Sequence, residues 1–291
     1  MTAIRLLSLA SVRPTPSLCA SRHVLRRTQA TVASGEPTAT ATNRAQATLK
    51  RFWKTVGIET QVNEHGGEHL AVMLDKRALK TPSGNPLLVP REKALTATLV
   101  AAEWDNQETQ LKQHSLPMTS LVSRAIDAFQ NSSNETRLEV HEQLLRYLET
   151  DTVCFHAEDP PSLVKQQEMY WEPLLAWARD TYDVKINVTT GFSLKPHPKT
   201  TLSTFREVLK DMNEWEIAAM ERATYTSKSF LIALALVKKH ISVDYAAQLA
   251  HVEVNSQIKT WGEVEDTHDV DYHDVRRQLG SAACILANHQ A

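Results

Sequence analysis

Residues 69–90 read HLAVMLDKRALKTPSGNPLLVP, and this stretch decides the fold of the N-terminal part of the chain. The apolar run over residues 69–74 is closed by Asp75-Lys76, and the Pro-, Ser-, Gly- and Asn-rich residues 81–85 form a second turn. Short apolar runs separated by turn residues are typical of antiparallel strands. The stretch therefore predicts a β-meander, and strands this short need another layer to cover them.

The sequence on both sides of this meander completes an α+β domain over residues 51–130. On the N-terminal side, apolar residues alternate with polar ones from Val56 to Val62. On the C-terminal side, Pro90 occupies the first position of a predicted helix, and a second helix follows Pro117. Apolar residues recur at helical spacing in both. They are Ala97, Val100, Ala101 and Trp104 in the first helix, and Met118, Leu121, Val122, Ala125, Ile126 and Phe129 in the second.

Residues 131–291 are predicted to form a larger, all-α domain, so the fold class is α+β. One long helix is expected over residues 214–240, and the last strong helix begins after the cap residue Ser242. Between the helices, residues 184–188 look like a short strand. The apolar stripes are Leu138, His141, Leu144, Leu145 and Leu148; Val164, Trp171, Leu174, Leu175, Ala178 and Tyr182, with Pro173 kinking this helix or starting its second half; Leu202, Phe205, Val208, Leu209 and Met212; and Ala247, Ala250, Val254, Ile258 and Trp261.

The first forty residues differ in composition from the rest. They contain five Arg and many Ser, Thr and Ala, and Glu36 is their single acidic residue. An Arg-rich, Ser-rich and acid-poor leader is typical of a mitochondrial transit peptide, and a disordered basic tail is the alternative. Residues up to about 48 have no apolar periodicity and are interpreted as a disordered joint.

Net charge and hydropathy exclude two classes of partner. The whole chain carries −2, and without the four net positive charges of residues 1–40 it carries −6. An acidic protein is poorly suited to nucleic acid, which requires a basic surface. No apolar run approaches the roughly 20 residues of a membrane-spanning helix, so we expect no membrane insertion. We expect the free protein to be monomeric.

Motifs for cofactors and catalysis are absent from the sequence. It contains neither a GxGxxG nor a GxxxxGK[ST] phosphate loop, no GxSxG elbow, and eight glycines in all. Cys19, Cys154 and Cys284 are too far apart for a CxxC zinc motif, and the last two are expected to be buried free thiols. We predict no cofactor, no metal and no catalytic residue.

One segment imitates a metal site. His268, Asp271 and His273 fall within HDVDYHD, and such residues would be the ligands of a metal-dependent hydrolase. Residues five apart, as the two histidines are, diverge on a helix and on a strand. A solvated acidic turn is the simpler interpretation, and the hydrolase is kept as the alternative function.

The acidic character of residues 251–275 suggests a surface for a partner. Seven carboxylates lie in this segment, and Lys259 is its single cation. Dense like charge is either a solvated helix end or a docking surface for a basic patch. Glu253, Gln257 and Trp261 are spaced four apart and share one helical ridge beside the apolar seam.

Trp104, within Glu103-Trp104-Asp105, is open to two interpretations. Its indole falls on the apolar face of the predicted helix, which favours a core position with the N–H bonded locally. A contact point on the surface is the alternative. In the core interpretation Trp104 is a structural residue, and arginine at this position would unfold the N-terminal domain.

Several stretches, taken in order, resemble one known family. They are RFW (51–53), LDKRALKTP (74–82), AEWD (102–105), ETDTVC (149–154), WEPLLAW (171–177), and VEV (252–254) followed by Gln257 and WGE (261–263). Over residues 51–286 the chain is similar to the mitochondrial F1-ATP synthase assembly factor 2 family, which are chaperones of the F1 α subunit.

The resemblance implies a matrix protein that binds the unassembled F1 α subunit and prevents its aggregation until the β subunit replaces it. It implies a small α+β domain followed by a helical domain, with neither ATP nor metal. In that family the acidic C-terminal part is implicated in function. We therefore assign partner binding to Glu253, Gln257, Trp261 and Glu263.

Overall fold

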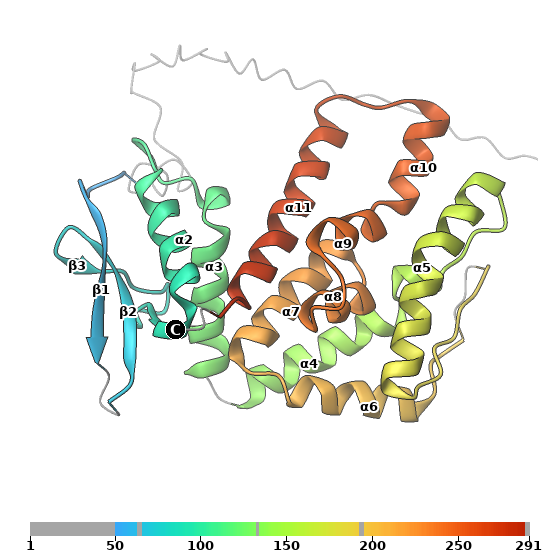
Figure 1. The fold of residues 1–291 in the computed structure, drawn as a ribbon, viewed down its shortest axis with the longest axis horizontal. Coiled ribbons are helices and arrows are strands. Elements are labelled where there is room, and N and C mark those ends of the chain that lie inside the picture. Colours follow the sequence, from blue (N-terminus) through green and yellow to red (C-terminus); the bar gives the residue numbers. More distant parts are fainter. Residues whose placement is uncertain (1–49, 63–65, 132–133, 192–194, 289–291) are drawn as a thin grey trace, which may run out of the picture. The chain divides into compact units, whose positions relative to one another are not determined.

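The computed structural model describes residues 50–62, 66–131, 134–191 and 195–288. Residues 47–291 group into one compact unit. The predicted transit peptide over residues 1–40, the joint up to about residue 48 and Cys19 lie outside the described residues. The sequence's α+β class is confirmed, with a small antiparallel sheet followed by helices (Figure 1).

The predicted meander forms an antiparallel sheet around a central strand. Strand β2 (Glu68–Leu74) pairs with β1 (Val56–Val62), β3 (Arg77–Ala78) and β4 (Leu88–Pro90). The tight turn between β2 and β3 contains Asp75 with a positive φ of 53°. Its carboxylate accepts hydrogen bonds from the backbone N–H groups of Lys54 and Thr55, which fixes the entry into β1.

Both helices predicted after the meander are present, and the first of them packs on the sheet. Helix α2 (Ala94–Asp105) contacts β1, β2 and β4, and α3 (Pro117–Arg124) packs against α2 and continues into the π-helical turn η3 (Ala125–Gln130). The prediction that Pro90 begins a helix is wrong. Pro90 ends β4 opposite His69, and the short 3-10 turn η1 (Arg91–Lys93) comes before α2.

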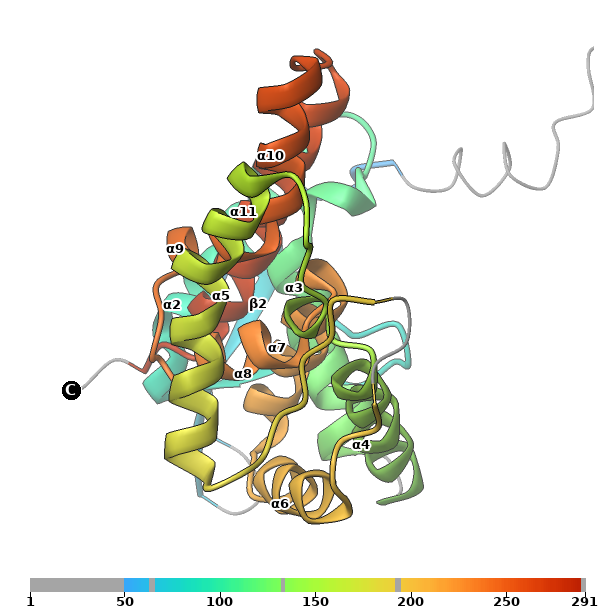
Figure 2. The same cartoon turned by 90° about the vertical axis from the view of Figure 1, so that its right-hand side faces the viewer.

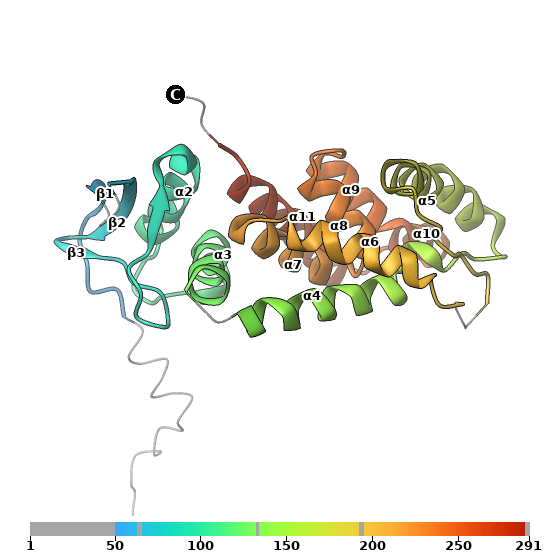
Figure 3. The same ribbon diagram turned by 90° about the horizontal axis from the view of Figure 1, so that it is seen from below.

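The next three helices follow the predicted stripes with two corrections. They are α4 (Asn134–Glu149), α5 (Pro161–Tyr182) and α6 (Lys199–Lys210), and Figure 3 shows α4 beside α6. Leu138 of α4 is 54% exposed, so it does not belong to the buried stripe. Residues 184–188 form no strand, and a single parallel bridge joins Phe155 to Thr189 directly after them. Pro173 lies inside α5, which continues through it.

The long helix predicted over residues 214–240 is two helices, α7 (Glu214–Ser227) and α8 (Phe230–Val237). Lys228 has a positive φ of 56°, and the Ser229 side chain accepts the N–H of Ile232, so α8 starts anew. Asp151, from a distant part of the chain, accepts the N–H of Leu231. All eight residues of α8 are buried, which makes it the centre of the helical part.

The C-terminal part differs most from the prediction. Ser242 caps α9 (Val243–Ala250) as expected, but the helix breaks at His251, and α10 (Val252–Trp261) follows. A further helix, α11 (Thr267–Ile285), occupies the segment interpreted as an acidic turn. Its apolar face is buried against α7, and the lower part of α11 lies next to α7 in Figure 1. This face comprises Val275, Leu279, Ala282 and Ile285.

The boundary predicted near residue 130 remains a prediction. Helix α3 contacts α7 and α11, and α2 also contacts α11. Of the two described cysteines, Cys154 is buried as expected, whereas Cys284 is partly exposed. Within the described part of the chain, no helix combines the length and the apolar character needed to cross a bilayer.

Candidate partner-binding surface

Helices α10 and α11 form a hairpin, and its outer end is the candidate surface. Helix α10 packs against α5 and α9, and it lies beside α5 in Figure 2. Gly262, with a φ of 89°, ends α10 in a conformation that favours glycine. We call residues 261–272, which run from the end of α10 into the first turns of α11, the hairpin tip.

The four residues predicted to bind a partner are all exposed. Glu253, Gln257 and Trp261 follow one another along α10, and Glu263 lies in the loop behind it. The buried side of α10 is formed by Val252 and Ser256 instead. Trp261, predicted to continue the apolar seam, is 79% exposed. An indole of that size left in water is the kind of group that anchors protein interfaces.

Further apolar side chains of the hairpin tip were missed from the sequence. Val264 is 58% exposed and Val270 is 66% exposed, and about half of Tyr272 is also accessible. The guanidinium of Arg276 lies 3.5 Å from the centre of the Tyr272 ring. Their sequence context could have identified them, because they are single apolar residues within an acidic segment.

Carboxylates surround these apolar side chains. Glu263, Glu265, Asp266 and Asp269 are exposed on the hairpin tip. Although Glu253 is exposed, neighbouring atoms partly desolvate its carboxylate and raise its pKa, while the ammonium of Lys228 acts in the opposite direction. Lys228 is the residue that ends α7, so this cation acts on Glu253 from outside α10. The surface therefore has an apolar part and a negative border.

Two contacts hold the hairpin in shape. Nε2 of His251, at the break between α9 and α10, lies 2.9 Å from Oδ2 of Asp271 in α11. The backbone N–H of Val264 donates to Nδ1 of His268 over 2.9 Å. These contacts tie the start of α10 and the loop to α11.

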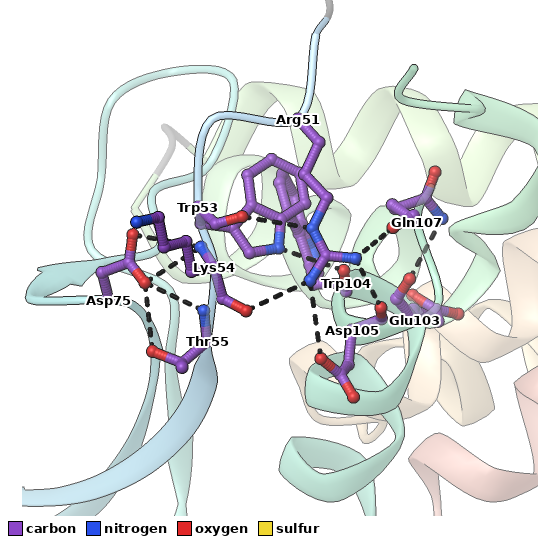
Figure 4. Close-up of polar contacts among 9 residues, drawn as sticks. All are labelled: Arg51, Trp53, Lys54, Thr55, Asp75, Glu103, Trp104, Asp105 and Gln107. Atoms are coloured by element: carbon purple, nitrogen blue, oxygen red, sulfur yellow. Dashed lines mark hydrogen bonds and ion pairs between the residues drawn. The ribbon is translucent and has the colours of Figure 1, made fainter. Parts of the chain in front are cut away.

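Trp104 belongs to a different region, on α2 in the N-terminal part of the described chain (Figure 4). Its indole is half-buried and packs against the core, with its N–H donating to Oγ1 of Thr119 over 3.0 Å. The ring of Trp53 lies 5.0 Å away, and the Trp53 N–H donates to the carbonyl of Trp104. Arg51 donates to the carbonyls of Trp53, Asp105 and Gln107. The RFW and AEWD stretches thus meet in one network.

Other stretches of the resemblance also support the fold. The Glu103 carboxylate accepts the N–H groups of Met118 and Thr119 at the start of α3, and burial raises its pKa. Thr81 donates to Asp127 over 2.7 Å. The Trp171 N–H donates to the carbonyl of Leu249. These residues are bound within the protein, whereas those of the hairpin tip face outward.

Comparison with known proteins decides the family. A family model described as ATP12 chaperone protein matches residues 50–179. The protein named "Protein atp12, mitochondrial" of Schizosaccharomyces pombe is 35% identical over 251 residues, covering 82% of this chain and 83% of that protein. The chain belongs to the ATP12 chaperone family. Protein ATP12, mitochondrial, of Saccharomyces cerevisiae is 30% identical over 285 residues, covering 84% and 86%.

Solved structures share the fold of this chain. Atp12 from Paracoccus denitrificans has the same fold, with a TM-score of 0.69 at 24% identity over 82% of this chain and 98% of that one. Atu1473 from Agrobacterium tumefaciens has a TM-score of 0.70 at 29% identity, over 84% and 89%. An ATP12-family chain is an assembly chaperone and not an enzyme.

The alternative function as a metal-dependent hydrolase is therefore wrong. The family is not enzymatic, and the three residues proposed as ligands have separate partners. His268 accepts from Val264, Asp271 pairs with His251, and His273 packs edge-on against Tyr272 at 5.2 Å. Among the described residues of this ATP12-family chain, no three His, Cys, Asp or Glu side chains are grouped to hold a metal.

Proposed function

We propose that this ATP12-family chain acts in the mitochondrial matrix, where it binds the unassembled F1 α subunit and prevents its aggregation until the β subunit takes its place. The observation that supports this most is the hairpin tip. It presents an exposed Trp261 together with Val264, next to the carboxylates of Glu263 and Glu265. The names of the two fungal relatives, which include the word mitochondrial, support a place in the mitochondrion.

The composition of this surface suits a temporary contact. An exposed aromatic anchor buries apolar area, and a charged border steers a basic partner without adding much affinity. A chaperone must release its client, so an interface with few strong anchors is appropriate. We assign Trp261 and Glu263 of the hairpin tip to this contact, together with Glu253 and Gln257 on the exposed side of α10.

Reversing the charge of Glu253 tests this assignment. The Glu253→Lys chain is expected to fold normally, because the side chain is exposed, and to lose at least about tenfold of its affinity for the α subunit. The measurement is light scattering of purified α subunit diluted from denaturant, with increasing amounts of the chaperone.

Glu139→Lys is the matched control, since Glu139 is an exposed carboxylate on α4, away from the hairpin. It is expected to suppress scattering as the unaltered chain does. Circular dichroism establishes that both variants are folded. The assignment is wrong if Glu253→Lys unfolds, or if it protects the α subunit as well as the control does.

A further inference from the structure

Strand β1 lies at an edge of the sheet and is exposed over most of its length. Within the described residues, β1 pairs with β2 along one side, and no strand pairs with the other side of β1. Gly57, Ile58, Glu59 and Thr60 are exposed in succession, so neither face of this part of the strand is fully covered. An edge of this kind offers a row of backbone donors and acceptors.

The register of the ladder identifies the backbone groups that point outward. The Asp75 N–H donates to the Thr55 carbonyl, which makes Thr55 and Asp75 a hydrogen-bonded pair. Backbone groups alternate in direction along a strand, so those of Gly57, Glu59 and Gln61 point to β2. Those of Ile58, Thr60 and Val62 consequently point away from the sheet.

The side chains along this edge include exposed apolar groups. Ile58 is opposite Val72, a fully buried core residue, so both side chains lie on the face that α2 covers. Even so, Ile58 is 39% exposed and Val62 is 65% exposed. Proteins commonly protect edge strands with Lys or Pro, and β1 contains neither. Its single charge is Glu59.

We propose that β1 is a second contact for the client, which adds an extended segment of the α subunit to the sheet as a new edge strand. This rests on the proposed function. The matching segment has apolar residues at alternate positions, to cover Ile58 and Val62, and a basic residue opposite Glu59. Backbone hydrogen bonds supply the affinity and the apolar alternation supplies the selectivity.

Charge argues against a second copy of this chain as the occupant. Full-length antiparallel pairing of two β1 strands places Val56 opposite Val62 of the copy. Glu59 then lies directly opposite its own counterpart, and like charges in that position are destabilising. A segment of a different protein, with a basic residue there, avoids this repulsion.

Hydrogen exchange of the full chain, with and without purified α subunit, tests the proposal. In the free chain the amides of Ile58, Thr60 and Val62 are expected to exchange fast, and those of Gly57, Glu59 and Gln61 slowly. Bound α subunit is expected to slow the first set at least about tenfold. Exchange is measured at single amides, because strand addition slows the outward amides selectively, whereas general burial of this region does not distinguish the two sets.

Thr60→Pro removes one outward N–H and leaves the ladder to β2 intact, because proline is tolerated where the donor faces solvent. It is expected to weaken binding of the α subunit about tenfold, whereas Thr60→Ser, which retains the N–H, is expected to bind normally. A second pair is Ile58→Lys, expected to weaken binding, and Leu138→Lys at an exposed position of α4, expected to be neutral.

The outcomes separate this inference from the proposed function. Protection at the hairpin tip with unchanged exchange in β1 overturns the inference and leaves the function standing. Failure of the unaltered chain to bind the α subunit overturns both. Slow exchange of the outward amides in the free chain, whether or not it depends on protein concentration, shows that another segment or copy covers the edge and also overturns the inference.

Discussion

Replacing Trp104 with arginine is expected to lower the free energy of unfolding by about 3 kcal/mol. The change removes the packing against Trp53 and the hydrogen bond to Thr119. The cavity beside Trp104 is lined by Lys80, Arg124 and Asp127, so a new guanidinium there meets two cations and one carboxylate. The measurement is urea denaturation followed by far-UV circular dichroism.

Trp104→Phe is the control for size and aromatic character. It retains a ring against Trp53 and loses the hydrogen bond from the indole N–H, so a smaller loss of about 1 kcal/mol is expected. Should Trp104→Arg be as stable as the unaltered protein and yet fail to bind the α subunit, Trp104 would be a surface contact and not a structural one.

The sequence predicts those strands and helices whose own residues show a regular apolar pattern. The meander has turn residues between short apolar runs, and the helices α2 to α6 show continuous stripes. The break between α7 and α8 has no such signal, because Lys228 adopts a positive φ without being glycine. One contact at this break, in which the N–H of Leu231 donates to Asp151, joins residues far apart in the chain. Single-sequence periodicity does not contain that information.

The sequence predicts only the part of the candidate site that lies on one helix. The ridge of Glu253, Gln257 and Trp261 follows from helical spacing, and the structure places all three at the surface. Helix α11 was missed because its first turns are acidic, and its apolar face begins only at Val275. Val264 and Val270 were consequently not assigned to the hairpin tip. Their exposure depends on how α10 and α11 are joined.

A second large effect is expected at His141, which is buried in α4 with neither ring nitrogen hydrogen-bonded to the described residues. Burial lowers the pKa of His141 to about 4 from its ordinary 6.5. The folded protein therefore binds fewer protons there than the unfolded chain does. Stability from this group is present above pH 6.5 and is lost as the pH falls toward 4, by about 3 kcal/mol.

Asp151 has the opposite dependence in nearly the same range. Its complete burial raises its pKa from 3.8 to about 6, against the hydrogen bonds that favour the carboxylate. The folded state then binds more protons than the unfolded state, so stability is full below about pH 4 and declines by about 3 kcal/mol as the pH rises through about 6. Together, the two groups nearly cancel between about pH 4 and 6.

His141→Leu is expected to remove the contribution of His141 to the pH dependence of stability and to leave that of Asp151. Leucine is of similar size and has no polar atoms to bury, so stability at about pH 7 is expected to rise by about 1 kcal/mol. The variant should then lose about 3 kcal/mol relative to its own value as the pH is raised from about 4 to about 6.5, because Asp151 is no longer opposed. Urea denaturation at several pH values measures both quantities. A pH dependence equal to that of the unaltered protein would contradict the assignment, since His141 would then titrate alike in the folded and unfolded states.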